Sequence, residues 1–124
     1  MTKTEDFERA LQKSWSLESS TLWSEETPTA GQCGVTALVA NDILNALIVK
    51  TRFGLTWHFY NLIDGKRYDF TKAQFEYPIV YDDIPASREE ALADTNDQQY
   101  GYLSKAVTAA LAADLTGDNS SECV

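Results

Sequence analysis

The dipeptide Asp64-Gly65 constrains the fold of this chain most strongly, because it separates two runs that are typical of β-strands. The run "LTWHFYNLI" before it is rich in aromatic and β-branched residues, and "KRYDFT" follows it. Asp-Gly accepts the positive φ angles that a two-residue type I′ turn requires. The sequence therefore predicts a tight antiparallel hairpin in which Ile63 lies opposite Lys66.

The register of this hairpin places His58, the single histidine of the chain, and Asp69 on one face of the sheet. We expect them to be diagonal neighbours, roughly 7 Å apart at the backbone. A carboxylate there can hold the imidazole in one tautomer and stabilise its protonated form. A three-residue loop would turn Asp69 to the other face, and Asp69 can alternatively be a turn or cap residue. Asn61 falls on the opposite face, where a structural role is expected unless a bulge brings it to His58.

The remaining pattern is mainly helical. Apolar spacing predicts a helix over residues 4–14, capped by Thr4, and a second helix from Cys33 to about 41–44. A strand is expected over 45–52, and an extended fragment in "PIVYDDIP". Ser87 is expected to cap a helix over 87–94 that presents a solvated acidic face, and the longest helix is predicted over 96–114.

This order of elements predicts one α+β domain over residues 1–114, with 115–124 as a flexible tail. The long polar segment 16–31 is expected to form one wall of a cleft, because compact domains rarely keep such loops without a role. Trp23 is its candidate wall residue, with a place in the core as the alternative. The helix around 100–111 is long enough to pair with a second copy, so a homodimer is one alternative.

Composition excludes several classes of function. The chain has 124 residues and a net charge of −9, without a Lys/Arg cluster, so nucleic acid and anionic membranes are not expected partners. No apolar run is long enough to span a bilayer. Without a signal peptide, and with its two cysteines far apart, the chain is predicted to be cytoplasmic with reduced thiols. No cofactor or metal motif is present, and Asp82-Asp83 is expected to be a solvated loop.

Cys33 is the candidate nucleophile. It is predicted at the first turn of a helix, where unpaired N–H groups and the helix dipole favour a thiolate and can stabilise an oxyanion. Gly34 leaves room for a substrate to approach, and Gln32 is either an oxyanion donor or a loop amide. The alternative for Cys33 is a buried, inert thiol on a core helix.

The pieces "GQCGVTAL", "WHFYN" and "YDFT" resemble the papain-like and transglutaminase-like cysteine enzymes, which share this order of Cys, His and Asp along the chain. With Trp15, Trp23, "DFT-x-x-QF" and "SREEAL", most of the chain resembles a group of small bacterial proteins, the YunG-like family. The resemblance implies a papain-like or transglutaminase-like core, in which a helix that begins at the cysteine packs on a small antiparallel sheet. It also implies Cys33 as nucleophile, His58 as base and Asp69 as the residue that orients His58.

The function expected from this pattern is a thiol-dependent amide or acyl-group hydrolase or transferase that acts on a small-molecule or peptide substrate. One alternative is a catalytically inactive binding module on the same fold. Another is an interaction protein whose 16–31 loop engages a protein partner.

Overall fold

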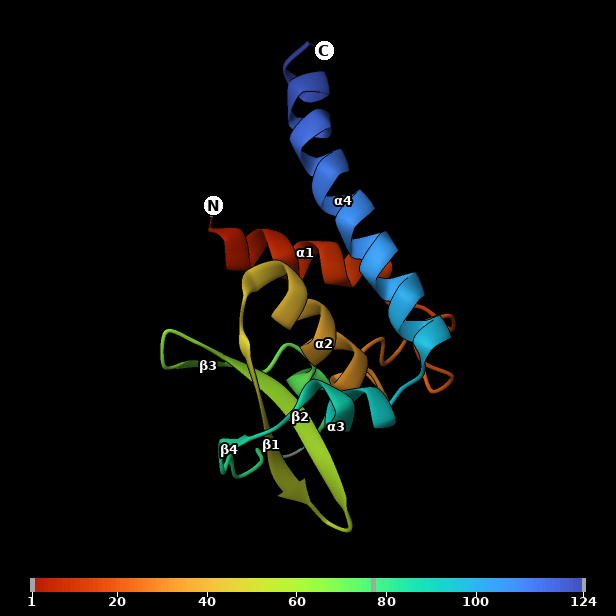
Figure 1. Ribbon diagram of the computed structural model, residues 1–124. Helices are drawn as coiled ribbons and strands as arrows, with labels where there is room; N and C mark the ends of the chain where they lie inside the picture. Colours follow the sequence, from red (N-terminus) through yellow and green to blue (C-terminus); the bar gives the residue numbers. More distant parts are fainter. Residues whose placement is uncertain (1, 77, 124) are drawn as a thin grey trace.

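The computed structural model confirms an α+β fold in which helices pack on a four-stranded antiparallel sheet (Figure 1). It describes residues 2–76 and 78–123, with side chains described up to residue 113. The elements, in chain order, are α1 Lys3–Ser14, α2 Cys33–Leu44, β1 Leu47–Phe53, β2 Thr56–Ile63, β3 Lys66–Tyr68, the 3₁₀ turn η1 Lys72–Gln74, β4 Ile84–Pro85, α3 Arg88–Ala93 and α4 Asp97–Cys123.

The predicted hairpin is confirmed. Ile63 pairs with Lys66, and both turn residues have positive φ, 52° at Asp64 and 79° at Gly65. This is the backbone geometry for which Asp-Gly is suited. The strand order is β3-β2-β1-β4, and all three pairs are antiparallel. β3 is short and pairs only with the end of β2 nearest the turn, so the rest of β2 has no strand partner on that side.

Helix α2 lies between the sheet and the other long helices (Figure 1). It is apolar on nearly every side, as expected for a helix covered all round. Its buried residues divide between two cores. One core joins it to α1 and α4 through Phe7, Leu11, Val35, Leu103 and Val107. The other joins it to the sheet and α3 through Leu38, Ile48, Phe59 and Ala91.

Two helix boundaries differ from the prediction. α1 is capped by Thr2 and not by Thr4: Thr2 and Glu5 form a reciprocal capping box, which satisfies two backbone N–H groups at once. α4 continues to Cys123, past the end predicted at residue 114. In Figure 1 its C-terminal part extends beyond α1. The mobility expected of residues 115–124 stays a prediction.

The apolar positions of α4 that suggested a homodimer are used inside the chain. Leu103 and Val107 are fully buried, and Tyr100, Ala110 and Leu111 pack against the same core. The homodimer stays a prediction. No helix in the described part of the chain is both long and apolar enough to cross a membrane.

Candidate functional site

The structure brings His58 and Asp69 together, as the hairpin register predicts. Nε2 of His58 and Oδ2 of Asp69 are 2.7 Å apart, and only 2% and 3% of the two side chains is exposed. Strand pairing already ends at Asn61 and Tyr68, so Asp69 reaches the imidazole from the segment that leaves the sheet. A hydrogen bond this short, shielded from water, holds the ring in a fixed orientation.

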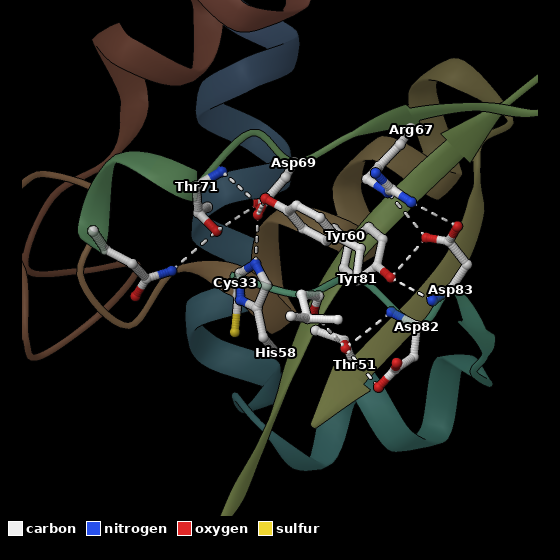
Figure 2. Close-up of polar contacts among 12 residues, drawn as sticks. Cys33, Thr51, His58, Tyr60, Arg67, Asp69, Thr71, Tyr81, Asp82 and Asp83 are labelled. Carbon is white, nitrogen blue, oxygen red and sulfur yellow. Dashed lines mark hydrogen bonds and ion pairs between the residues drawn. The ribbon is translucent and has the colours of Figure 1, made fainter. Parts of the chain in front are cut away.

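Asp69 is itself held by three further hydrogen bonds. Thr71 donates to Oδ1 from its backbone nitrogen at 3.2 Å and from its hydroxyl at 3.4 Å. Tyr81 donates its hydroxyl to Oδ2 at 2.8 Å, and Figure 2 shows Asp69 between the side chains of His58 and Thr71. The sequence analysis did not predict a role for Tyr81. This residue lies in an irregular segment, where no sequence pattern indicates that it contacts Asp69.

Cys33 is the first residue of α2, as predicted, and it is a free thiol. It lines the same cleft as His58. The backbones of Phe59 and Gly34 act to lower the pKa of Cys33. Phe59 follows His58 on β2, so this interaction places the thiol near the strand that carries His58. The side chain of Cys123 lies outside the described part of the chain.

Asp94, at the C-terminal end of α3, completes the surroundings of the thiol. Its Oδ2 accepts hydrogen bonds from the Cys33 sulfur at 3.4 Å and from the Gly34 backbone nitrogen at 3.1 Å. The helix over 87–94 was expected to present only a solvated acidic face, and this expectation is wrong for its last residue. The carboxylate of Asp94, 60 residues from Gly34 in sequence, thus satisfies one of the unpaired N–H groups at the start of α2.

The electrostatics of the thiol are therefore opposite to the sequence expectation. Burial, and next the negative charge of Asp94, raise the pKa of Cys33 to about 12. Burial also raises the pKa of Asp94, while its hydrogen bonds with Cys33 and Gly34 and the charge of His58 act in the opposite direction. The helix N-terminus already holds an anion, so its dipole stabilises the carboxylate and does not act on the sulfur alone.

The cleft around Cys33 and His58 has a volume of about 360 Å³, within the range of small-molecule sites. The predicted loop wall is confirmed, because residues 20–22 and Gly31 line one side. Aromatic residues of the β1–β2 hairpin and of the segment after η1 line another, namely Phe53, Trp57 and Phe75. Two amide side chains, Gln74 and Gln99, also border the cleft.

The three predicted binding residues do not line this cleft. Gln32 is fully buried, and its Nε2 donates to the backbone oxygen of Pro28 at 3.3 Å. Trp23 packs against the core that joins α1, α2 and α4. Gly34 packs closely against α3: a Cβ there would lie 2.5 Å from Asp94 Oδ2 and 2.8 Å from the Ala91 oxygen. The missing side chain therefore leaves room for α3, and the expected role of Gly34 toward a substrate stays a prediction.

Asn61 is the structural amide that was predicted. It is buried, and its Nδ2 donates to the backbone oxygens of Ala37 and Leu47, both at 3.2 Å. It thereby ties α2 to the sheet on the face opposite His58.

Asp82 and Asp83 are not simply solvated. Asp82 accepts a hydrogen bond from Thr51, and Asp83 accepts two from Arg67 and one from Tyr60. Figure 2 shows this second network beside the His58–Asp69 pair. It anchors the segment that carries Tyr81 to β1, β2 and β3. Among the described residues, no group of three or more His, Cys, Asp or Glu side chains is arranged to hold a metal ion.

The comparisons with known proteins identify the family. The family model described as YunG protein matches residues 3–112 of the chain. The chain belongs to the YunG family. It is 56% identical over 96 residues to the Bacillus subtilis (strain 168) protein named "Uncharacterized protein YunG", and the match covers 77% of this chain and 84% of that relative. No solved structure matches the chain. Since residues 3–112 include every residue of the cleft, the site lies within the segment that defines the YunG family.

Proposed function

We propose that the cleft is the active site of a thiol-dependent amide or acyl-group hydrolase or transferase. Cys33 is the nucleophile, His58 the base and Asp69 the residue that orients His58. The observation that carries the proposal is the buried His58–Asp69 pair, with its 2.7 Å hydrogen bond, in the wall of a cleft that also exposes the thiol at the start of α2. The resemblance of "GQC" and "YDFT" to papain-like and transglutaminase-like enzymes supports the same roles.

The first step is proton transfer. Because Asp69 uses Nε2 of His58, Nδ1 is the nitrogen that takes the thiol proton as Cys33 attacks a carbonyl carbon. The imidazolium that results lies beside the Asp69 carboxylate, which stabilises its charge. Nucleophilic attack then gives a tetrahedral intermediate, and its collapse leaves an acyl group on sulfur while the leaving group takes the proton from His58.

The developing oxyanion needs hydrogen-bond donors. The backbone N–H groups of the first turn of α2 have no carbonyl partners within the helix, but Gly34 donates to Asp94. The backbone N–H of Cys33 is therefore the proposed hydrogen-bond donor to the oxyanion from this turn. Gln99 brings an amide group to the cleft, and its Oε1 accepts from Thr95 at 2.7 Å, which orients the amide.

The experiment that tests this proposal is trapping of an acyl-enzyme. With p-nitrophenyl acetate, the wild-type chain should release a burst of p-nitrophenolate and acquire an acetyl group on Cys33, located by peptide mass spectrometry. Cys33→Ala should lose the burst, whereas Cys123→Ala should keep it. Acetylation at equal rates in the wild-type chain and in His58→Ala would contradict the proposal.

A second candidate is a binding module that uses the same cleft without covalent chemistry. The observation in its favour is the hydrogen bond from the Cys33 thiol to Asp94, together with the raised pKa of that thiol, since a protonated thiol is a weak nucleophile. A ligand that stabilises Cys33→Ala and the wild-type chain equally against heat, with no acyl-enzyme from any ester, would favour this candidate.

A further inference from the structure

The wall of the cleft has an uneven distribution of charge. Asp94 places a carboxylate in it, yet no lysine or arginine among the described residues lines the cleft or forms an ion pair with Asp94. Lys50 and Arg52 contact the ring of Trp57, but neither of them lines the cleft. Asp94 is exposed to solvent and has no lysine or arginine partner in this part of the chain, so its carboxylate is accessible to a positively charged group of a ligand and attracts it electrostatically.

Aromatic rings add to this preference for a cation. The rings of Phe75 and His58 are perpendicular, with centroids 4.7 Å apart, and the centroids of the Phe75 and Phe53 rings are 4.6 Å apart. Both phenylalanines line the cleft with Asp94. The negative face of an aromatic ring attracts an ammonium group and repels a carboxylate. The net charge of −9 also favours the approach of cations over anions.

We propose that the cleft recognises its ligand through a protonated amine that pairs with Asp94, and that this pairing releases the Cys33 thiol from Asp94. The inference rests on the proposed function, since it makes Asp94 the residue that selects the substrate of the Cys33 nucleophile. The substrate class is an amide or acyl compound with a primary ammonium group close to the reacting carbonyl. Asp94 is a specificity-determining residue in this account, because its carboxylate pairs with the ammonium group of the ligand and takes no part in bond formation at the carbonyl carbon.

The release of the thiol follows from the geometry. The Asp94 carboxylate holds the thiol proton at 3.4 Å between sulfur and oxygen. An ammonium group that binds the carboxylate competes for the same oxygen and neutralises the charge that opposes the thiolate. The proton of Cys33 is then free to pass to His58. Binding of the correct ligand thus raises the reactivity of the Cys33 thiol above its level in the unliganded protein.

The test uses the full chain in a Cys123→Ala background, with the neutral disulfide 4,4′-dithiodipyridine as the reporter of Cys33 reactivity at pH 8. Butylammonium is the probe, butanol the neutral control and butyrate the anionic control. Butylammonium should accelerate the reaction in a saturable way by about threefold to tenfold, because more thiolate forms while its intrinsic nucleophilicity falls. Butanol and butyrate should give no acceleration.

Two variants locate the effect. Asp94→Asn keeps an oxygen that can accept from Gly34, so it should fold; it should react faster than the parent without amine and show no response to butylammonium. Glu89→Gln removes an exposed carboxylate from the same helix and should behave like the parent. In Cys33→Ala, butylammonium should still shift the amide resonance of Gly34 in a nitrogen–proton correlation spectrum. This shift measures binding of the amine at Asp94 in a protein that lacks the thiol.

An equal response to butylammonium and butanol, or an unchanged response in Asp94→Asn, would overturn the inference. The failure of the proposed function would look different. If His58→Ala left the acylation of Cys33 unchanged, His58 would not be the base. Butylammonium could still accelerate the reaction of the thiol through Asp94, so the two failures give different results.

Discussion

Asp94 and Cys33 meet at the beginning of α2, where one carboxylate oxygen lies 3.4 Å from the sulfur. The same oxygen accepts the backbone N–H of Gly34 at 3.1 Å, so Asp94 caps the helix that begins at Cys33. The position that would favour a thiolate anion is therefore shared with a carboxylate from α3. In the proposed mechanism, the reactivity of Cys33 depends on this contact as well as on the His58–Asp69 pair.

Asp94→Asn should lower the pKa of Cys33 below its value of about 12. Removal of the negative charge removes one of the two main causes of the shift, and burial keeps the pKa above the ordinary value of about 8.5. The ultraviolet absorbance of the thiolate, followed against pH in a Cys123→Ala background, measures this directly. An unchanged or higher pKa in the variant would show that the Asp94 carboxylate does not oppose the thiolate.

Gly34→Ala should destabilise the chain by about 1–3 kcal/mol, because the added methyl group overpacks a filled site. Its Cβ would lie 2.5 Å from Oδ2 and 2.7 Å from Cβ of Asp94, so α3 would have to move. Gly101→Ala is the matched control, since a Cβ there meets nothing within 4 Å and alanine favours the helix by up to about 1 kcal/mol. Urea denaturation measures both, and equal effects of the two variants would contradict this account.

Asp69→Ala should lower the free energy of unfolding by about 2–3 kcal/mol, because His58, Tyr81 and Thr71 would lose their shared acceptor. Asp69→Asn keeps the size of the side chain and one acceptor oxygen, so its loss should be smaller. Urea denaturation at neutral pH gives both values. A loss below about 0.5 kcal/mol for Asp69→Ala would mean that these groups find other partners or water.

The raised pKa of Cys33 also predicts a loss of stability at alkaline pH. A thiol whose pKa is higher in the folded chain stabilises the fold below the unfolded pKa, and this contribution disappears as the pH rises toward about 12. Between about pH 9 and pH 11 the unfolding free energy of the wild-type chain should therefore fall more steeply than that of Cys33→Ala. Burial also raises the pKa of Tyr60 and Tyr81, but both tyrosines are present in each variant.

The control for this pH dependence is Cys123→Ala, which should follow the wild-type slope. Chemical denaturation at several pH values provides the comparison. Parallel curves for the wild-type chain and Cys33→Ala would show that the thiol ionises equally in the folded and unfolded chains.

Local sequence signals predicted much of this fold. Asp64-Gly65 set the hairpin register, because few dipeptides accept two positive φ angles. Apolar spacing within residues 4–14 predicted α1, and its buried residues are Phe7, Ala10, Leu11 and Ser14. Its cap was also readable, since Thr2 and Glu5 carry the capping-box spacing. The prediction placed the cap at Thr4 because it relied on apolar spacing alone.

The candidate site was predicted only where it depends on local chain geometry. His58 and Asp69 lie 11 residues apart and are joined by one hairpin, so their meeting could be inferred. Asp94 and Tyr81 reach the site through tertiary packing of short elements, α3 and the segment before β4, whose positions no local pattern specifies. Position 34 requires glycine because Asp94 packs against it. This requirement can be recognised only when the position of α3 is known.

The central claim is that His58 takes the proton of Cys33, and the most direct test is the pH dependence of Cys33 alkylation by iodoacetamide. The comparison is between the chain with His58 and His58→Ala, both in a Cys123→Ala background, with folding checked by circular dichroism. The chain with His58 should react faster from pH 6 to pH 9, and the substitution should abolish this advantage. Superimposable pH profiles for the two proteins would contradict the account.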